Sequence, residues 1–538
     1  MKNALTRHLD GRNETPQTEP IPGREAEMGK NAAGGVVFKL DKWEQFRRFL
    51  ILGTEGGTYY TSERKLTAGN VAVVETCVAE NGQRAVNLIV EVSEGGIAPK
   101  NTQAIYALAV AAGAANTKTR QAANAAIGRV CRTGTHLYEF VDYIDLLGQR
   151  GWGRGLTSGI ARVLEEMPLK KLALHSVKYR QRNGQTYARV LRRTHPQTDE
   201  VERNLIFQHM LGKADKDELG AHESLGVIEG FYAIQEAGSD KEAIRLIEEY
   251  NLPWEAVPDQ FRKSAAVWEA ILPNSGLMAI TRNLATFARL GMLTPMGATE
   301  QFIVGKLTDD DAIAGSRMHP IHFLNASRVH ASGGSGGLSR GATYTVNHNV
   351  VKALDKAFKK AFKSVEPTGK RHYLGLDVSG SMGFQACAGT AITPREGSAA
   401  MALVTDAVEP LTYVAGFTGG SSLTPINLGS SLTSAIRSVS GLPFGGTDCA
   451  LPMLDALKKG IEVDQFVVYT DNETWAGSMA PVQALQKYRK ETEIPAKLAV
   501  VGMTSTGFSI ADPTDAGMMD FVGFDASTPK AISIFASE

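Results

Sequence analysis

The chain has 538 residues, of which 43% are apolar and 21% are charged. This length allows roughly three or four domains and excludes a small scaffold that depends on disulfides. Lys plus Arg and Asp plus Glu both total 57, so the overall charge points to no nucleic-acid, membrane or acidic partner, and any such signal must be local.

The cysteines and the N-terminus bound the cellular setting. Cys77, Cys131, Cys387 and Cys449 lie far apart and form no C-x-x-C pair, which favours free thiols in a reducing compartment over a zinc site. The N-terminus has no apolar signal-peptide core, and no stretch approaches ~18 uninterrupted apolar residues. We therefore expect a cytoplasmic protein without a membrane partner.

The first part of the chain predicts a short arm followed by many helices. Residues 1–35 are polar and lack periodicity, which is typical of a flexible arm that could order on binding. From residue 36 to 364, apolar residues recur at helical spacing in short segments separated by Gly, Pro, Asn and Asp. Helices are expected over residues 104–115, 119–130, 137–147, 156–167, 225–236, 242–249, 261–272, 277–290 and 350–362. Such a series with few strands predicts stacked helix pairs of the HEAT or armadillo kind.

The pattern changes near residue 365. Continuous apolar runs at 372–378, 412–417, 465–470 and 496–503 alternate with helical segments near 397–407, 430–439, 450–459 and 481–490. This alternation predicts a parallel sheet covered by helices on both faces. Residues 365–538 are therefore expected to form a doubly wound α/β domain, which makes the fold class α plus α/β in separate domains.

Polar side chains follow the strands of this predicted domain. The run 372–378 leads into Asp377, Ser379 and Ser381, a later loop carries Thr447, and the run 465–470 is followed by Asp471. Ligands of open parallel sheets bind beyond the carboxyl ends of the strands. Hydroxyl and carboxylate oxygens suit an octahedral Mg²⁺ or Mn²⁺. Because hydroxyls are neutral, the ion would still attract a carboxylate or phosphate of a partner, so a recognition site is predicted.

Two alternatives to this recognition site stay open. Asp and Ser after a strand also cap turns and helices, which gives D-x-S-x-S alone a structural explanation. The same geometry could serve an Mg²⁺-dependent phosphohydrolase that uses Asp377, but the acid/base position two residues later holds Ser379. We therefore expect no enzyme. A metal-site adaptor that captures a protein carboxylate is the main rival to nucleic-acid binding.

The segment 169–198 has a strong local excess of positive charge and no acidic residue. It contains Lys170, Lys171, His175, Lys178, Arg180, Arg182, Arg189, Arg192, Arg193 and His195. If it is helical, one face carries a basic stripe of Lys171, His175, Lys178 and Arg182, with Tyr179 beside it. Such a stripe can follow phosphates while Arg, Tyr, Gln and Asn side chains contact unpaired bases. A solvated helix face is the alternative, but the lack of compensating acids favours RNA binding.

Several longer segments carry a family resemblance. FLILGTEGGTYY, VCRTGTHLYEF, KYRQRNG, VEPTGKR, DVSGSM, GGTDCALPM, YTDNETWAG and GMTSTGFSIADP, in this order, resemble the Ro 60 kDa (TROVE module) RNA-binding protein family. The resemblance implies a ring of HEAT-like repeats over residues 36–364, closed by a von Willebrand factor A domain over residues 365–538. It also implies a metal-ion-dependent adhesion site, whose five motif positions are matched by Asp377, Ser379, Ser381, Thr447 and Asp471.

The resemblance further implies partners. Members of the family bind Y RNAs on a basic outer surface and single-stranded 3′ ends of misfolded noncoding RNAs in the ring, and they act in RNA quality control. Bacterial members can cooperate with an exoribonuclease through a Y RNA tether. The family's K-Y-x-Q-R-N-G segment is matched by Lys178, Tyr179, Gln181, Arg182, Asn183 and Gly184. Gln185 and Tyr187 replace a tryptophan and a histidine that are common in the family, a departure that concerns fine specificity for a Y RNA.

Overall fold

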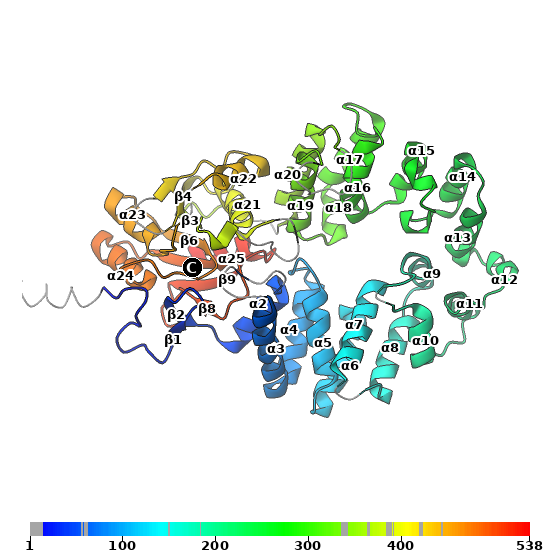
Figure 1. Ribbon diagram of the computed structural model, residues 1–538, viewed down its shortest axis with the longest axis horizontal. Helices are drawn as coiled ribbons and strands as arrows, with labels where there is room; N and C mark the ends of the chain where they lie inside the picture. The colour runs from blue at the N-terminus through cyan, green and yellow to red at the C-terminus, as the bar shows by residue number, and fades with distance from the viewer. Residues whose placement is uncertain are drawn as a thin grey trace, which may run out of the picture.

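The structure is a computed structural model in which a long series of helices leaves an α/β domain and returns to it (Figure 1). It describes residues 14–54, 58, 63–148, 151–182, 184–334, 343–362, 366–383, 390, 392–418, 423–442 and 445–538. Within these ranges no helix has the length and apolar character needed to cross a membrane. Cys77, Cys131 and Cys449 are free and buried, whereas Cys387 lies outside the described residues.

The first half of the helical series stacks in pairs. Its helices are α2 (Lys42–Leu52), α3 (Glu63–Glu80), α4 (Gly82–Glu94), α5 (Thr102–Ala112), α6 (Thr117–Val130), α7 (Gly134–Leu147) and α8 (Arg154–Glu165). Side chains of Asn81, Asn116 and Thr133 cap the starts of α4, α6 and α7, as expected for short polar residues before helices. Helix α4 packs on α6, α5 on α7, and α6 on α8. This two-layer stacking confirms the HEAT-like arrangement.

The second half continues the arc and brings it back to the α/β domain (Figure 1). Its helices are α9 (Leu169–Lys178), α10 (Tyr187–Thr194), α11 (Val201–Met210), α12 (Lys216–Gly220), α13 (Gly226–Glu236), α14 (Asp240–Tyr250), α15 (Ala265–Ile271), α16 (Leu277–Arg289), α17 (Ala298–Thr308), α18 (Asp310–Ser316), α19 (Pro320–Ala331) and α20 (His348–Ala361). The helices expected from the sequence are confirmed. Residues 261–272 are divided, because a 3₁₀ turn over Phe261–Lys263 precedes α15.

The C-terminal domain has a six-stranded sheet in the order β5-β4-β3-β6-β7-β9. Its strands are β3 (Arg371–Asp377), β4 (Leu411–Phe417), β5 (Leu423–Pro425), β6 (Gln465–Thr470), β7 (Lys497–Gly502) and β9 (Met518–Val522). All pairs are parallel except that of edge strand β5. Leu374 and Leu376 share one core with α21 (Pro394–Asp406), α22 (Leu432–Ser440) and α25 (Thr528–Ser537). Tyr373 shares the opposite core with α23 (Leu451–Lys459) and α24 (Pro481–Thr492), which confirms the doubly wound domain.

Residues 14–40, called the N-terminal segment below, lie against the α/β domain. Strands β1 (Met28–Lys30) and β2 (Val36–Lys39) pair with each other, and β2 pairs with β8 (Phe508–Ser509). The sequence analysis expected a flexible arm over residues 1–35. The structure instead packs residues 14–35 on the domain, because their side chains reach hydrogen-bond partners more than 400 positions away, as Gln17 does with Asp448 (|i−j| = 431). Residues 1–13 lie outside the described residues.

Both ends of the helical arc are fastened to the α/β domain. At the first end, the buried Arg48 on α2 forms two 2.6 Å hydrogen bonds to the Asp520 carboxylate. At the other end, His319 accepts the Ile321 N–H at Nδ1 (3.1 Å) and donates from Nε2 to the Phe524 carbonyl. His322 on α19 donates to the carbonyl of Pro99 before α5 at 3.0 Å. The two ends of the arc therefore meet each other and the α/β domain, so the ring is closed.

The buried ion pair of Arg48 gives a test of this closure. Arg48→Met is expected to lower the free energy of unfolding by about 3–5 kcal/mol, because it leaves the largely buried Asp520 carboxylate without the positive charge of Arg48. Urea denaturation measures the change. Arg129→Met is the matched control, because the Arg129–Glu94 pair also has two hydrogen bonds but is exposed to solvent. Its loss should lower the free energy of unfolding by less than about 1 kcal/mol. If both substitutions lower the free energy of unfolding equally, the Arg48–Asp520 pair does not have the structural role given to it here.

Candidate metal centre and nucleic-acid interface

The loop after β3 arranges the first three predicted metal residues. Asp377 ends the strand with no exposed surface, and its Oδ1 accepts the N–H of Ser379 at 3.0 Å. Its Oδ2 accepts the hydroxyl of Thr470 at 2.7 Å. The hydroxyls of Ser379 and Ser381 are 3.0 Å apart. The turn therefore holds one carboxylate and two hydroxyls at the carboxyl end of β3.

The other two predicted metal residues are Asp471, which follows the neighbouring strand β6, and Thr447, which lies in the loop before α23. Strand β6 pairs with β3. The Asp471 carboxylate accepts the N–H of Glu473 at 3.0 Å and also accepts a hydrogen bond from the Ser381 hydroxyl. The carbonyl of Thr447 accepts N–H groups of the chain after Asp471, that of Trp475 among them at 3.0 Å. The Thr447 hydroxyl is fully buried and has no hydrogen-bond partner among the described residues. All five predicted residues thus lie at one edge of the sheet.

Burial and proximity shift the pKa values of the carboxylates at this end of the sheet. Burial raises the pKa of Asp377, and burial together with the nearby Asp377 raises the pKa of Asp471 well above its usual value. Burial also raises the pKa of Glu473 to about 7. No group of three or more His, Cys, Asp or Glu suited to a metal occurs in the described part of the chain. The available oxygens are two carboxylates and three hydroxyls, and the unpartnered Thr447 hydroxyl fits a hard divalent ion.

The predicted basic stripe on one helix is wrong. Helix α9 ends at Lys178, and a turn in which Arg182 pairs with Gln185 leads to α10, so Arg182 does not continue the helix. His175 is 5% exposed, lies 3.3 Å (Nδ1) from the Tyr187 hydroxyl and packs edge-on against Tyr179. Burial lowers the pKa of His175 to about 4, so this residue is neutral near pH 7 and belongs to the core.

Acids from other helices also reach the basic segment, which the local sequence could not reveal. Glu255 pairs with Lys178 at 3.3 Å, and Glu139 on α7 pairs with Arg182 at 3.6 Å. Asp145 at the end of α7 forms ion pairs with both Arg189 (3.6 Å) and Arg193 (2.7 Å). Four exposed cations have no ion pair within the described ranges, and they are Lys170, Lys171, Arg180 and Arg192. The basic surface that is free of ion pairs is therefore smaller than the sequence predicted.

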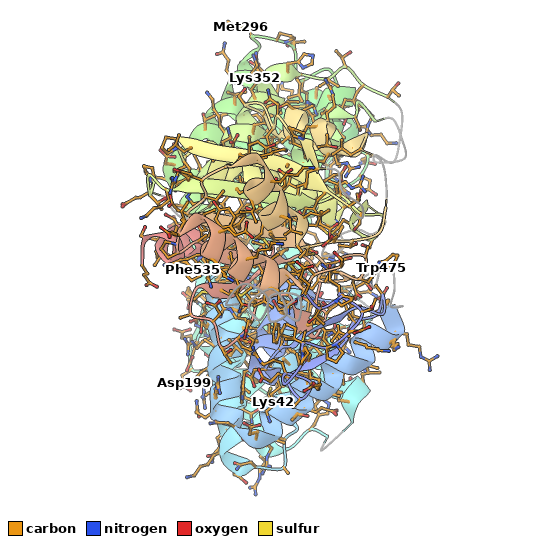
Figure 2. The ribbon with its side chains drawn as sticks, turned by 90° about the vertical axis from the view of Figure 1, so that its left-hand side faces the viewer. Lys42, Asp199, Met296, Lys352, Trp475 and Phe535 are labelled. Atoms are coloured by element: carbon orange, nitrogen blue, oxygen red, sulfur yellow. The ribbon has the colours of Figure 1, made fainter. Side chains whose placement is uncertain are left out.

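The remaining predicted RNA-binding residues fall into three settings. Gln181 and His195 are exposed and Tyr179 is half-buried, whereas Asn183 lies outside the described residues. Trp152 was not among the predicted RNA-binding residues; its ring lies 4.5 Å from the Arg193 guanidinium, and its indole N–H donates to Asp145 at 2.9 Å. Sequence reasoning passed over Trp475, which is 40% exposed at the surface beside the metal loop (Figure 2).

Together, the fold and site define a ring of helical repeats closed by an α/β domain with a mixed hydroxyl and carboxylate edge. Residues 29–226 and 245–333 match the TROVE domain, and residues 371–536 match the Ro60 vWA domain. The chain belongs to the Ro60 family of TROVE proteins.

Relatives of this family cover the whole chain. The chain is 41% identical to the RNA-binding protein RO60 of Deinococcus radiodurans over 543 residues, covering 100% of this chain and 99% of the relative. It is 30% identical to the RNA-binding protein RO60 of Caenorhabditis elegans, covering 94% and 90%. The crystal structure of the Deinococcus radiodurans RO (RSR) protein matches with a TM-score of 0.69 and 41% identity, covering 92% of this chain and 99% of that one.

The buried state of His175 predicts a pH effect on stability. Its pKa is about 4 in the folded protein and ordinarily about 6.5 in an unfolded chain, so acidification protonates the unfolded state first. The stability it contributes is present above pH 6.5 and is lost as the pH falls toward 4. His175→Gln should therefore reduce the drop in unfolding free energy between pH 7 and pH 5 by about 2 kcal/mol, measured by urea denaturation at both values. An unchanged drop would contradict a buried, neutral His175.

Proposed function

We propose that the protein binds RNA through the exposed cations of the basic segment. The observation that carries this proposal is the face of α9 and the following turn, where Lys170, Lys171 and Arg180 are exposed and form no ion pair with the described residues, although Arg180 lies 5.2 Å over the Phe231 ring. Unpaired cations attract phosphates through counterion release. Family membership and relatives named RNA-binding proteins support the same conclusion.

The finer proposal concerns which RNAs bind and where. Y-like small noncoding RNAs bind on the basic outer surface, and single-stranded 3′ ends of misfolded noncoding RNAs enter the ring. Selection then depends on shape, because a protruding strand passes an opening that an A-form duplex cannot. The closed ring, in which α19 meets both the start of α5 and the α/β domain, supports this mechanism. Such selection suits a role in RNA quality control and involves no chemical step by this protein.

Equilibrium binding tests the RNA proposal. Two RNAs share one stem-loop, one with a single-stranded 3′ tail and one blunt, and their affinities are measured across a salt series. The tailed RNA is expected to bind more tightly, with log affinity falling linearly with log salt. Replacing the four unpaired cations by Ala should flatten this slope by about three, at roughly 0.7 per lost phosphate contact. These cations are Lys170, Lys171, Arg180 and Arg192.

A matched control separates local from global charge. A second variant removes four exposed lysines from other surfaces, and these are Lys241, Lys352, Lys458 and Lys530. It has the same net charge as the test variant and should keep the wild-type slope. Equal slopes for the two variants would mean that RNA binding does not use the basic segment. Absence of binding to either RNA would overturn the proposal and leave the metal-site adaptor as the better function.

We also propose that the edge of the sheet holds Mg²⁺ or Mn²⁺. Ser379 and Ser381 would bind it directly, Thr447 directly or through water, and Asp377 and Asp471 directly or through the hydroxyls. When bound, the ion supplies an electrophilic position for a carboxylate or phosphate of a partner. The unpartnered Thr447 hydroxyl beside two buried carboxylates supports this proposal. Because Ser379 stands where a phosphohydrolase carries its second acid, we infer recognition rather than hydrolysis.

The metal proposal predicts a gain of stability that one carboxylate controls. Mn²⁺ at about 100 times its dissociation constant should add about 2.7 kcal/mol to the unfolding free energy of the wild type. Asp471→Asn should remove most of this gain, because it removes a charge from the ion's surroundings. Asp199→Asn, which removes an exposed carboxylate elsewhere, should keep it. Thermal unfolding with and without Mn²⁺ measures both, and chelation should leave RNA affinity largely unchanged.

A further inference from the structure

Gln17 of the N-terminal segment is a buried polar anchor between two loops of the α/β domain. Its side chain is 1% exposed, and its Nε2 donates to the Asp448 carboxylate at 2.7 Å and to the Met479 carbonyl at 2.9 Å. Its Oε1 accepts the hydroxyl of Thr474 and the N–H of Gly477 (3.3 Å). Both ends of the amide are therefore fully used, which is uncommon for a residue in a polar terminal arm.

Asn31 makes a second anchor on the same loop. Its Nδ2 donates to the carbonyls of Asn472 (3.1 Å) and Thr474 (2.9 Å), and its Oδ1 accepts the N–H of Gly35 (2.8 Å). A Cβ on Gly35 would lie 1.7 Å from the Thr474 carbonyl oxygen, so the backbones approach as closely as only glycine allows. Gln17 and Asn31 thus both contact the loop that begins at Asp471.

The loops that these anchors hold carry two of the five proposed metal residues. Asp448 directly follows Thr447, and the Thr474 hydroxyl that Gln17 accepts lies 3.2 Å from the Thr447 carbonyl. Asn472 directly follows Asp471. Gln17 therefore touches the Thr447 loop and the Asp471 loop at once, and Asn31 touches the second again. Neither anchor belongs to the metal-residue set.

We propose that Gln17 and Asn31 are positioning residues for the metal centre, acting through the loops of Thr447 and Asp471. The inference rests on the proposed metal site. Outer hydrogen bonds of this kind orient the ligating groups of a metal site, and their loss commonly costs 10–100-fold in metal affinity. Thr447 and residues 471–474 in these loops are buried, and the hydrogen bonds of the two anchors are among the contacts that hold the loops in place.

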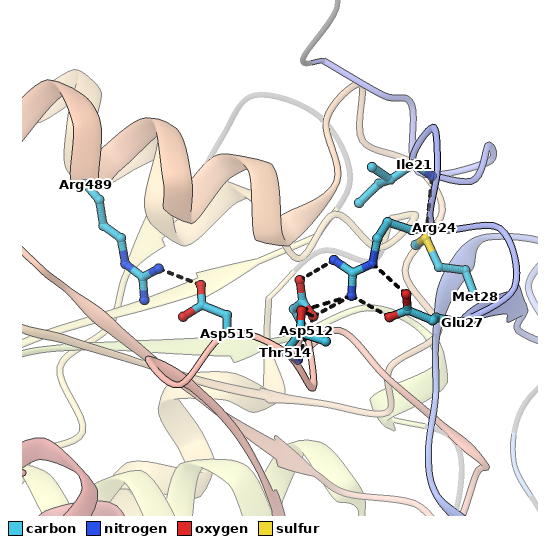
Figure 3. A network of polar contacts seen from close by, with 8 residues as sticks. All are labelled: Ile21, Arg24, Glu27, Met28, Arg489, Asp512, Thr514 and Asp515. Carbon is cyan, nitrogen blue, oxygen red and sulfur yellow. Dashed lines mark hydrogen bonds and ion pairs between the residues drawn. The ribbon is translucent and has the colours of Figure 1, made fainter.

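The same segment contains a natural control at Arg24 (Figure 3). Its guanidinium makes two 2.7 Å hydrogen bonds to Asp512 and pairs with Glu27. Asp512 lies beyond β8, in the turn that also holds Asp515, so Arg24 itself bonds to neither metal loop, although Ile510 just before this turn donates its N–H to the Asn472 side chain at 3.1 Å. Substitution of Arg24 loosens the attachment of the segment without removing either anchor.

Manganese binding by the full-length protein tests the inference. The variants Gln17→Met, Asn31→Asp and Arg24→Met are titrated with Mn²⁺ alone, and free Mn²⁺ is followed by electron paramagnetic resonance. The two anchor variants are expected to bind at least tenfold more weakly than the wild type, and Arg24→Met within twofold of it. Without metal, amide hydrogen exchange over residues 471–477 should rise in the anchor variants only. Thermal unfolding of each variant identifies any that fail to fold.

Each failure has its own signature. Wild-type Mn²⁺ affinity in both anchor variants would overturn the positioning role while leaving the metal site in place. An equal loss in Arg24→Met would also overturn it, because general loosening of the segment would then explain the result. If the wild type itself binds no Mn²⁺, both the metal centre and this inference are wrong, whereas RNA binding is judged by its own assay.

Discussion

The structure depends on closure of the helical arc against the α/β domain. Short stacked helices bury their apolar faces only against neighbours, so the two ends of an open arc would remain uncovered. Here Arg48 fastens the first end through Asp520, and His319 fastens the other through the Phe524 carbonyl. His319 is buried with its pKa lowered to about 3, so it stays neutral and keeps its cap on α19 across ordinary pH. The α/β domain is therefore a structural part of the ring.

Closure also brings the helical arc to the proposed metal site. The carbonyls of Thr506 and Phe508 accept hydrogen bonds from Arg48 at 3.2 and 2.9 Å. The hydroxyl of Thr506 in turn lies 3.4 Å from the Asp471 carbonyl. On the other side, the N-terminal segment continues from its anchors directly into α2 through β2. Two separate sets of contacts thus join α2 to the loop of Asp471.

Much of this architecture was predictable because it follows local rules. The strands of the α/β domain are buried on both faces and read as continuous apolar runs, and four of the five predicted metal residues end or follow β3 and β6, which pair with each other. The N-terminal segment escaped prediction, since Gln17 and Asn31 show no periodicity and their partners lie more than 400 residues away. His175 was misjudged because a histidine among lysines looks basic until tertiary packing buries it.

The basic segment shows why local charge counts mislead. Arg193 appeared free for RNA, yet it lies over Trp152 and is paired with Asp145, whose pKa is lowered in part by that contact. Cations held in this way fix α10 on α7 and have already exchanged water for protein partners. Cations without such partners can neutralise phosphates and so release the counterions condensed on the RNA into solution. The distinction between the two groups is set by Glu139, Asp145 and Glu255, which come from outside the segment. The electrostatic surface offered to RNA is therefore a property of the closed fold rather than of the basic segment alone.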